Sequence, residues 1–146
     1  MKVFYESKLA KWMLFPGYST ITLGCFVFTK KSKAEVEQRV LNHEAIHVRQ
    51  WEEMTIASAI VLLLCLPFGV SLCWALITPL VFYLWYGVEY IIRLCGWLWR
   101  GIRGTSYKSV SHAAYRNISF EKEAYGNEQI AGYLDVRKLF EVIAYL

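Results

Sequence analysis

The stretch MTIASAIVLLLCLPFGVSLCWALITPLVFYLWYGV, residues 54–88, carries no charged side chain. Its 35 residues exceed what one membrane-spanning helix needs and fall short of two comfortable spans. Pro67 and Gly69 break the run, so its first arm, 54–66, would reach about 20 Å as a helix. The second arm begins at Val70 and attains an ordinary spanning length. The run therefore predicts a hydrophobic hairpin that either crosses a lipid bilayer twice or dips into it and returns.

The remainder of the chain is too small to bury this hairpin in a soluble core. The 146 residues suit a single domain, 1–146, yet 56% of them are hydrophobic and 16% are aromatic, more than a soluble domain usually has. Downstream, EYIIRLCGWLWRGIR adds tryptophans and arginines that are typical of an interfacial anchor, which extends the hairpin to about 54–100. A core hairpin buried within a soluble oligomer is the alternative.

Basic residues flank the hairpin on both sides, and the formal net charge is +4. They are Lys30, Lys31 and Lys33 before it, and Arg93, Arg100, Arg103 and Lys108 after it. Because positively charged flanks stay in the cytoplasm, both sides are predicted to lie on the cytoplasmic face. No nucleic-acid-binding motif accompanies these charges, so the expected partner is a lipid bilayer and not nucleic acid.

The four cysteines show no spacing that indicates a metal or disulfide framework. Cys25, Cys65, Cys73 and Cys95 form no CxxC pair, and the last three lie in or beside the apolar run. They are interpreted as small buried hydrophobic residues. The N-terminal segment MKVFYESKLAKWMLF lacks the apolar core of a cleavable signal peptide.

Directly before the apolar run, the segment LNHEAIHVRQW, residues 41–51, contains two of the three histidines. A helix is predicted to begin after Ser32, which has a glutamate at the capping-box position, Glu35. From Lys33 onward the apolar and histidine positions follow helical spacing, so His43 and His47 share one face.

His43, Glu44 and His47 fit the pattern H-E-x-x-H. Both imidazoles can reach one Zn²⁺ ion, and Glu44 lies beside that face, where it can take a proton from a metal-activated water and pass it to a leaving amine. Two histidines on one helix also occur by accident. The pattern alone therefore makes catalytic zinc a hypothesis that needs a third ligand.

The third ligand must come from elsewhere in the chain. The longer form HExxHxxGxxH would require glycine and histidine at positions where this chain has Gln50 and Glu53. The segment SFEKEAYGNEQIAGYLDVRKLFEVIAYL, 119–146, is predicted to be a helix that Ser119 caps. Its acidic residues form either a solvated face or a source of the missing ligand, and they are Glu121, Glu123 and Glu128.

HEAIH followed by FEKEAYG resembles the gluzincin branch of zinc metallopeptidases, in particular small membrane-associated members such as the CAAX-type and stress proteases. In those proteins a second helix carries the ligand glutamate in a pattern like E-x-x-A-D. The resemblance implies a zincin-like fold with Glu121 as ligand, although Tyr125 stands at the aspartate position. The alternative register makes Glu123 the ligand and puts Asn127 in the supporting place.

The N-terminal 31 residues are predicted to be extended. STITLGCFVFTKK is rich in β-branched and aromatic residues and follows a turn at Pro16 and Gly17, so a strand pair is expected. The resemblance implies that the strand near 19–28 forms the edge of a substrate cleft. Candidate substrate-binding residues are His112 and Arg116, with Tyr115 beside them; a plain surface histidine is the alternative for His112.

Together these features predict an α+β, mainly helical protein. An N-terminal β-hairpin leads into the HExxH helix, then into a membrane hairpin and a C-terminal ligand helix. The expected function is zinc-dependent hydrolysis of a peptide or protein substrate at a membrane, with either a partner or self-association into a homo-oligomer completing the cleft in so small a chain. The alternatives are a non-catalytic membrane protein with a structural metal or a partner-binding role, and zinc hydrolysis of a non-peptide amide or ester.

Overall fold

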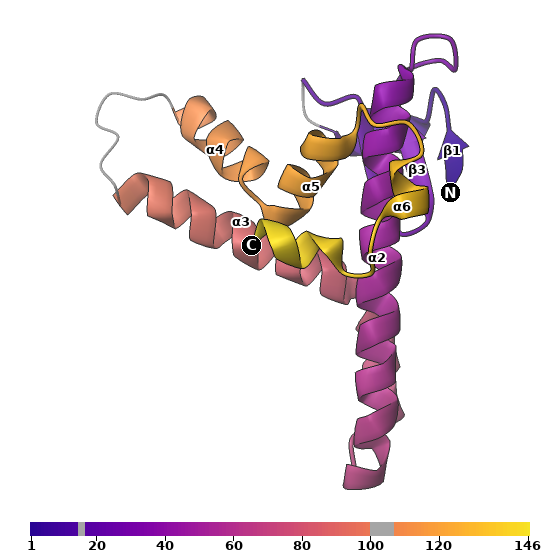
Figure 1. Cartoon of the computed structure of the whole chain (residues 1–146), viewed down its shortest axis with the longest axis vertical. Helices are drawn as coiled ribbons and strands as arrows, with labels where there is room; N and C mark the ends of the chain where they lie inside the picture. Colours follow the sequence, from indigo (N-terminus) through magenta and orange to yellow (C-terminus); the bar gives the residue numbers. More distant parts are fainter. Residues whose placement is uncertain (15–16, 100–106) are drawn as a thin grey trace.

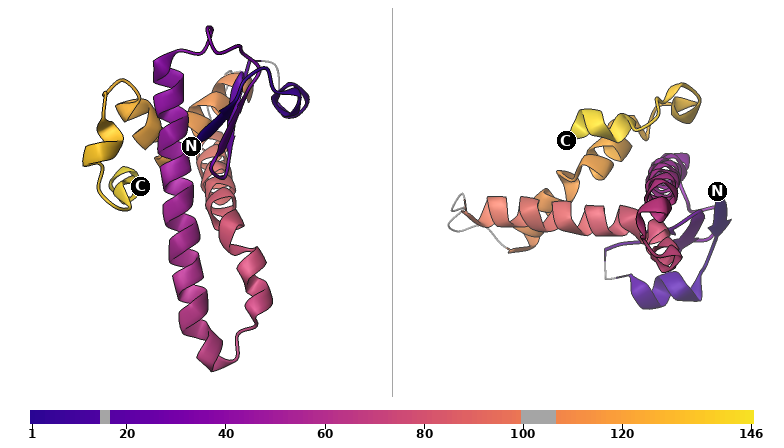
Figure 2. Two further views of the ribbon diagram at one scale, coloured as in Figure 1. Left: turned by 90° about the vertical axis from the view of Figure 1, so that its right-hand side faces the viewer. Right: turned by 90° about the horizontal axis from the view of Figure 1, so that it is seen from below.

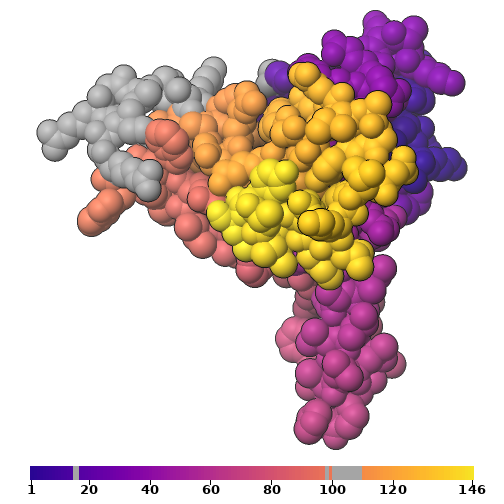
Figure 3. All heavy atoms as spheres, viewed as in Figure 1, coloured from indigo at the N-terminus to yellow at the C-terminus, as the bar shows by residue number. Residues whose placement is uncertain are grey.

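The computed structural model describes residues 1–14, 17–99 and 107–146, and it confirms an α+β, mainly helical architecture. A small sheet and several short helices surround the upper half of one long helix, α2 (Figure 1). The lower half of α2 projects from this body together with the turns that follow it. The space-filling view shows the projection as a narrow extension below a broad body (Figure 3).

The predicted strand pair is present as β2, Thr20–Leu23, and β3, Phe26–Thr29, which run antiparallel. Gly24 lies in their tight turn with φ +62°, and a Cβ there would meet the Trp51 ring at 3.3 Å, so both conformation and space favour glycine. A third strand, β1, Lys2–Phe4, pairs parallel to β3, which gives the sheet order β1-β3-β2. Strand β2 therefore forms one edge of the sheet.

The prediction that residues 1–31 are extended throughout is wrong over one segment. Helix α1, Lys8–Met13, begins after Ser7, whose hydroxyl accepts a hydrogen bond from the Ala10 amide. A parallel pairing such as β1 with β3 needs a crossover, and α1 forms part of that connection. Of the predicted turn, Gly17 has φ +98°, and Pro16 lies outside the described residues.

Helix α2, Gln38–Cys65, begins later than the sequence pattern predicts. The amide and hydroxyl of Ser32 both donate to Glu35 Oε2 at 2.8 Å, as a capping box would, but they close a separate turn. The helix begins after Glu37 instead. The predicted hydrogen bonds between Ser32 and Glu35 therefore form, but they stabilise a turn that precedes the helix and not the start of the helix itself.

The break predicted at Pro67 and Gly69 is confirmed. A short 3-10 turn, η1, Leu66–Phe68, ends at Gly69, which adopts φ +87°. The chain returns through η2, Leu72–Leu76, and η3, Thr78–Leu80. The second arm is thus not one helix from Val70, because its regular helix starts only after Pro79.

Helix α3, Val81–Trp99, runs crosswise to α2 rather than back along it (Figures 1 and 2). Two segments, Gln38–Phe68 and Leu72–Trp97, are long and apolar enough to cross a membrane, and only 11% of each apolar window is buried. Within this chain they are therefore less buried than the core helices of a soluble monomer. Arg100 and Arg103, predicted to anchor the hairpin, lie outside the described residues, and so does the end of the 54–100 segment.

The cysteines are free thiols, and the prediction that they are buried is wrong. Cys25 and Cys65 are half-buried, whereas Cys73 and Cys95 are exposed. Cys65 and Cys73 belong to the projecting hairpin and Cys95 belongs to α3, where apolar side chains in general face outward.

The C-terminal third forms several short helices instead of one long one. Helix α4, Tyr107–Arg116, occupies a polar stretch and was not predicted. Helix α5, Ser119–Asn127, is followed by α6, Tyr133–Val136, and a 3-10 turn, η4, Glu141–Tyr145. Left-handed backbone at Gly132 and Phe140 separates them.

The predicted cap of this region is also different. Ile118, not Ser119, is the N-cap of α5, and the amide and hydroxyl of Ser119 donate to the buried carboxylate of Glu89 on α3. Phe82 of α3 packs on Phe120 of α5 with ring centroids 4.8 Å apart. These contacts fix α5 against α3, and Gln50 of α2 donates to the Phe120 carbonyl, so α5 lies beside the histidine-bearing turns.

Candidate metal centre

His43 and His47 lie one turn apart on the buried face of α2. Their Nε2 atoms approach each other to 3.1 Å, and both side chains are almost fully buried. Helical geometry alone accounts for this pairing, because residues i and i+4 project on the same side. Two imidazole nitrogens therefore point into one small volume.

Helix α5 brings Glu121 to the same point. Its Oε1 lies 3.2 Å from His47 Nε2, and its Oε2 lies 3.4 Å from His43 Nε2. The ligand atoms of the three residues all lie within 4.8 Å of one another. Among the described residues, Glu121 Oε2 is buried without a hydrogen-bond partner. The site thus contains a buried carboxylate oxygen that still lacks a donor or a cation.

The outer nitrogens of both histidines are already engaged. His43 Nδ1 lies 2.9 Å from Glu128 Oε2, and His47 Nδ1 lies 2.8 Å from Gln50 Oε1. Carboxylate and amide oxygens only accept, so each Nδ1 must carry a proton that it donates. In a neutral imidazole this leaves the Nε2 lone pair free and aimed at the other histidine and at Glu121, which is the tautomer that a metal ligand needs.

Glu123, the alternative third ligand, is not brought to the histidines. Its carboxylate accepts hydrogen bonds from Gln50, Tyr133 and Arg137 on the far side of α5. Arg137 also pairs with Glu53 of α2, so one guanidinium joins two buried carboxylates. Burial alone would lower the pKa of Arg137, but these two carboxylates raise it above its usual value. Glu123 is therefore fully committed to an ion pair.

Glu44 lies beside the histidines and faces strand β2. Thr22 donates its hydroxyl proton to Glu44 Oε2 at 2.5 Å, which orients the carboxylate. The hydroxyl of Tyr86, on α3, donates to Glu121 Oε1 at 2.7 Å. Each carboxylate of the site is therefore held by a hydroxyl from a different element.

A cavity of about 280 Å³ opens onto this group of residues. Strand β2 forms one wall, and aromatic side chains of α3 and α4 form the other. Besides the histidines and glutamates, its lining includes Ile21, Leu23, Phe82, Tyr83, Tyr86 and Tyr115. The cavity is therefore apolar and aromatic, with its acid–base groups concentrated at one end.

The weaker sequence candidates have mixed outcomes. Tyr115 lines the cavity, whereas His112 and Arg116 are exposed and are not among its lining residues. The guanidinium of Arg116 instead stacks over the Tyr125 ring at 4.4 Å. Tyr125, at the aspartate position of the implied pattern, contacts the His43 ring edge-on with centroids 4.6 Å apart. The Asn127 amide donates to the Glu123 carbonyl and to the Tyr145 hydroxyl, so its hydrogen bonds within the described residues do not support a histidine.

Electrostatics within the site favour an ionised Glu121. Burial raises the pKa of its carboxyl group, but the neighbouring imidazoles of His47 and His43 outweigh burial and lower that pKa below its usual value. Burial, together with the Glu121 carboxylate, raises the pKa of Tyr115 well above its ordinary value, so Tyr115 stays a neutral hydroxyl. The site therefore combines a buried carboxylate with two adjacent imidazoles and a neutral tyrosine hydroxyl.

Sequence reasoning missed the residues that orient the site. Glu128 was considered only as a ligand, and Gln50 only as a departure from a longer motif, whereas each fixes one histidine. The helical repeat offered a signal for Gln50, three residues after His47, and for Glu128, seven residues after Glu121, because both spacings return to the same helix face. Nothing local indicated Thr22 or Tyr86, which reach the site only through the tertiary fold.

No protein-family model matches this chain, and neither a curated protein sequence nor a solved structure matches it.

Proposed function

We propose that the chain is a zinc-dependent metallopeptidase of gluzincin type, a hydrolase with a zincin-like arrangement built on a membrane hairpin. The observation that carries this proposal is the convergence of two imidazole Nε2 atoms and one carboxylate, each with its orientation fixed from behind. Three acceptors that face one another in a buried site repel unless a positive charge, either a metal ion or a proton on one imidazole, lies between them.

The donor set fits zinc. Two imidazole nitrogens and one carboxylate are the ligands of many catalytic zinc sites, which keep a fourth position open. His43, His47 and Glu121 would hold the ion, with Glu128 and Gln50 behind the histidines. Zinc bound there supplies a Lewis acid that polarises a scissile carbonyl and makes water acidic enough to attack at neutral pH.

Glu44 is the residue that moves the proton. It lines the cavity directly beside His43 and His47, and Thr22 holds one of its oxygens. In this position the carboxylate accepts a proton from the attacking water and returns it to the departing amine. The neutral hydroxyls of Tyr115 and Tyr86 line the same cavity and surround the reacting group with donors.

The substrate is proposed to be a peptide segment. Strand β2 is an edge strand and lines the cavity along its whole length, so an extended peptide can pair with it while its side chains enter the aromatic pocket. The basic flanks around the apolar hairpin favour the cytoplasmic side of the membrane for this cleft.

The experiment that tests the proposal measures hydrolysis by detergent-purified protein loaded with zinc. The probes are fluorescein-labelled casein and an acylated fluorogenic peptide held on vesicles. Glu44→Gln keeps the shape of the side chain and removes its basicity, so we expect zinc content to stay unchanged while the rate falls by roughly 10²–10⁴-fold. Wild-type activity retained by Glu44→Gln contradicts the proposal, and zinc binding without hydrolysis of either probe favours a structural metal site.

A further inference from the structure

The apolar hairpin and helix α3 differ in direction, and this difference bears on how the chain meets a membrane. We define the stalk as residues 54–80, which comprise the lower half of α2 and the turns η1 to η3. The stalk points away from the body, whereas α3 runs across its base (Figures 1 and 2). Two spanning arms would instead have to lie side by side along the membrane normal.

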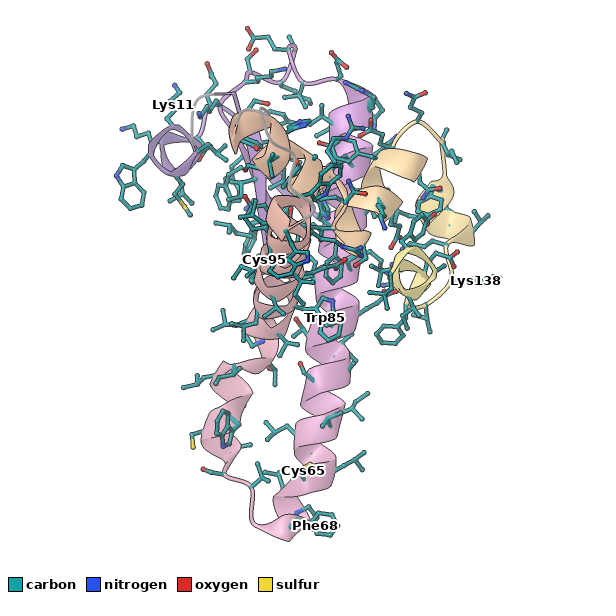
Figure 4. The ribbon with its side chains drawn as sticks, turned by 90° about the vertical axis from the view of Figure 1, so that its left-hand side faces the viewer. Lys11, Cys65, Phe68, Trp85, Cys95 and Lys138 are labelled. Atoms are coloured by element: carbon teal, nitrogen blue, oxygen red, sulfur yellow. The ribbon has the colours of Figure 1, made fainter. Side chains whose placement is uncertain are left out.

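The stalk exposes large apolar side chains along its length and at its end. Phe68 is 87% exposed and Leu76 is 78% exposed, and Cys65 and Phe68 occupy the far end in Figure 4. No charged residue occurs anywhere in the stalk. An exposed apolar surface of this size is not tolerated in water, so it needs lipid or protein around it.

The stalk is too short to reach the far side of a bilayer. From Met54 to Cys65 and on through η1 to Phe68, helical rises give roughly 24 Å. The hydrocarbon core is about 30 Å thick, and the headgroups extend it to about 40–45 Å. The turn would therefore lie within hydrocarbon, which agrees with the apolar character of Phe68, Leu72 and Leu76.

Helix α3 is amphipathic, and its apolar face is on the side of the stalk. Leu84, Val88 and Ile92 are all more than half exposed and follow helical spacing. The opposite face holds Phe82, which packs on α5, and Glu89, which binds Ser119. Helices α4 and α5 lie above α3 in Figure 1 and the stalk extends below it, so the exposed face is directed toward the stalk side.

We propose that this face of α3 and the stalk form one lipid-binding surface, with which the protein sits monotopically in a single face of a bilayer. The stalk dips into the hydrocarbon and returns, while α3 lies in the plane of the interface. In Figure 4 Trp85 lies at the lower part of the body, with the exposed Lys138 and then Cys95 above it, and a tryptophan and a lysine there suit the headgroup level.

This geometry brings the candidate metal centre close to the membrane. His47 lies seven residues above Met54 on α2, a rise of about 10 Å. A peptide that reaches the cleft would therefore belong to a protein anchored in the same membrane. That consequence rests on the proposed function, whereas the mode of insertion does not, and His43→Ala is expected to insert like the wild type.

The native cysteines provide the test. In full-length protein reconstituted into sealed phosphatidylcholine–phosphatidylglycerol vesicles, three single-cysteine variants retain Cys73 at the turn, retain Cys95 on α3, or carry Ala34→Cys on the exposed turn near Ser32. A membrane-impermeant maleimide is supplied outside or trapped inside. We expect Ala34→Cys to react from the side on which the body lies, and Cys73 to lose its reactivity toward both sides until detergent is added.

Depth completes the test. With a bimane label, Cys73 should be quenched most by nitroxide at the end of the lipid tail, and Cys95 by nitroxide near the headgroup. Labelling of Cys73 from the side opposite to Ala34→Cys overturns the proposal in favour of a spanning hairpin. Cys73 could instead be protected from the maleimide, show no quenching by lipid nitroxides and form Cys73–Cys73 crosslinks. That result overturns the proposal, because it shows that a second copy of the chain covers the stalk.

Discussion

The two halves of helix α2 have opposite relations to their surroundings. The upper half buries polar side chains, namely His43, Glu44, His47, Gln50 and Glu53, while the lower half exposes Ile56, Ile60, Val61, Leu63 and Leu64. In a soluble protein a helix usually buries its apolar side chains and exposes its polar ones. Each half of α2 departs from that rule, the upper half by burying polar side chains and the lower half by exposing apolar ones. The upper half is stabilised by specific partners from α5 and the C-terminal segment, and the lower half by whatever apolar medium surrounds it.

This difference teaches that the polar residues of α2 do not mark the side of the helix that faces water. They mark the part of the helix that forms the candidate site. A buried polar group costs free energy unless it is hydrogen-bonded or paired. Each of the five buried polar residues of the upper half has a hydrogen-bond partner. The buried oxygen without a partner at this site, Glu121 Oε2, belongs to α5 and faces the histidines. The predictions below test each side of the comparison in turn.

The largest effect is expected from Arg137, because it neutralises two buried carboxylates at once. Arg137→Ala leaves Glu53 and Glu123 buried without a cation, which should reduce the free energy of unfolding by about 3–5 kcal/mol. Chemical denaturation in detergent, followed by tryptophan fluorescence, measures this change. The neighbouring Lys138→Ala removes an exposed charge and should change stability by less than about 0.5 kcal/mol; equal effects would show that the ion pair is not a stabilising element.

The local part of the fold could be predicted from sequence, because its signals lie within a few residues. Pro67 and Gly69 mark the turn of the hairpin, and β-branched and aromatic residues mark β2 and β3. The path of α3 could not be predicted, since it depends on long-range contacts such as Glu89 with Ser119. The lower end of α2 likewise continues the histidine helix without a break, which composition alone does not indicate.

The candidate site was predictable in its chemistry and not in its arrangement. His43 and His47 follow from helical spacing, but Glu121 and Glu123 are both buried on α5. Arg137 distinguishes the two glutamates, because it forms an ion pair with Glu123. Arg137 belongs to a segment that was predicted to be one continuous helix. A partner 14 residues away, beyond the left-handed backbone at Gly132, leaves no periodic trace in the sequence.

A smaller effect is expected from Glu128, which orients His43 from behind. Glu128→Gln keeps the size of the side chain but replaces the acceptor carboxylate, so zinc affinity should fall by about 10–100-fold. Competition with a chromophoric chelator measures that affinity. Glu52→Gln, a partly exposed glutamate on the same helix α2, serves as the control and should leave the affinity unchanged; a similar loss in both variants would contradict an orienting role.

The smallest effect is expected in the stalk. Leu64 is 67% exposed, so Leu64→Ala should change the free energy of unfolding in detergent by less than about 0.5 kcal/mol. Ile46→Ala, on the upper half of the same helix, removes a buried side chain and should cost about 2–5 kcal/mol. Denaturation midpoints compare the two, and a large loss at Leu64 would mean that the stalk is packed in the native state.

Zinc content tests the central claim most directly. Detergent-purified protein, prepared without chelator, is measured by atomic emission for the wild type, His47→Ala, Glu121→Ala, Glu123→Gln and Glu52→Ala, with folding checked by circular dichroism. We predict about one zinc per chain in the wild type, as a three-ligand site requires. Zinc should be lost in His47→Ala and Glu121→Ala and kept in Glu123→Gln and Glu52→Ala. A folded wild type without zinc, or a Glu121→Ala variant that still binds it fully, would contradict the proposed metal centre.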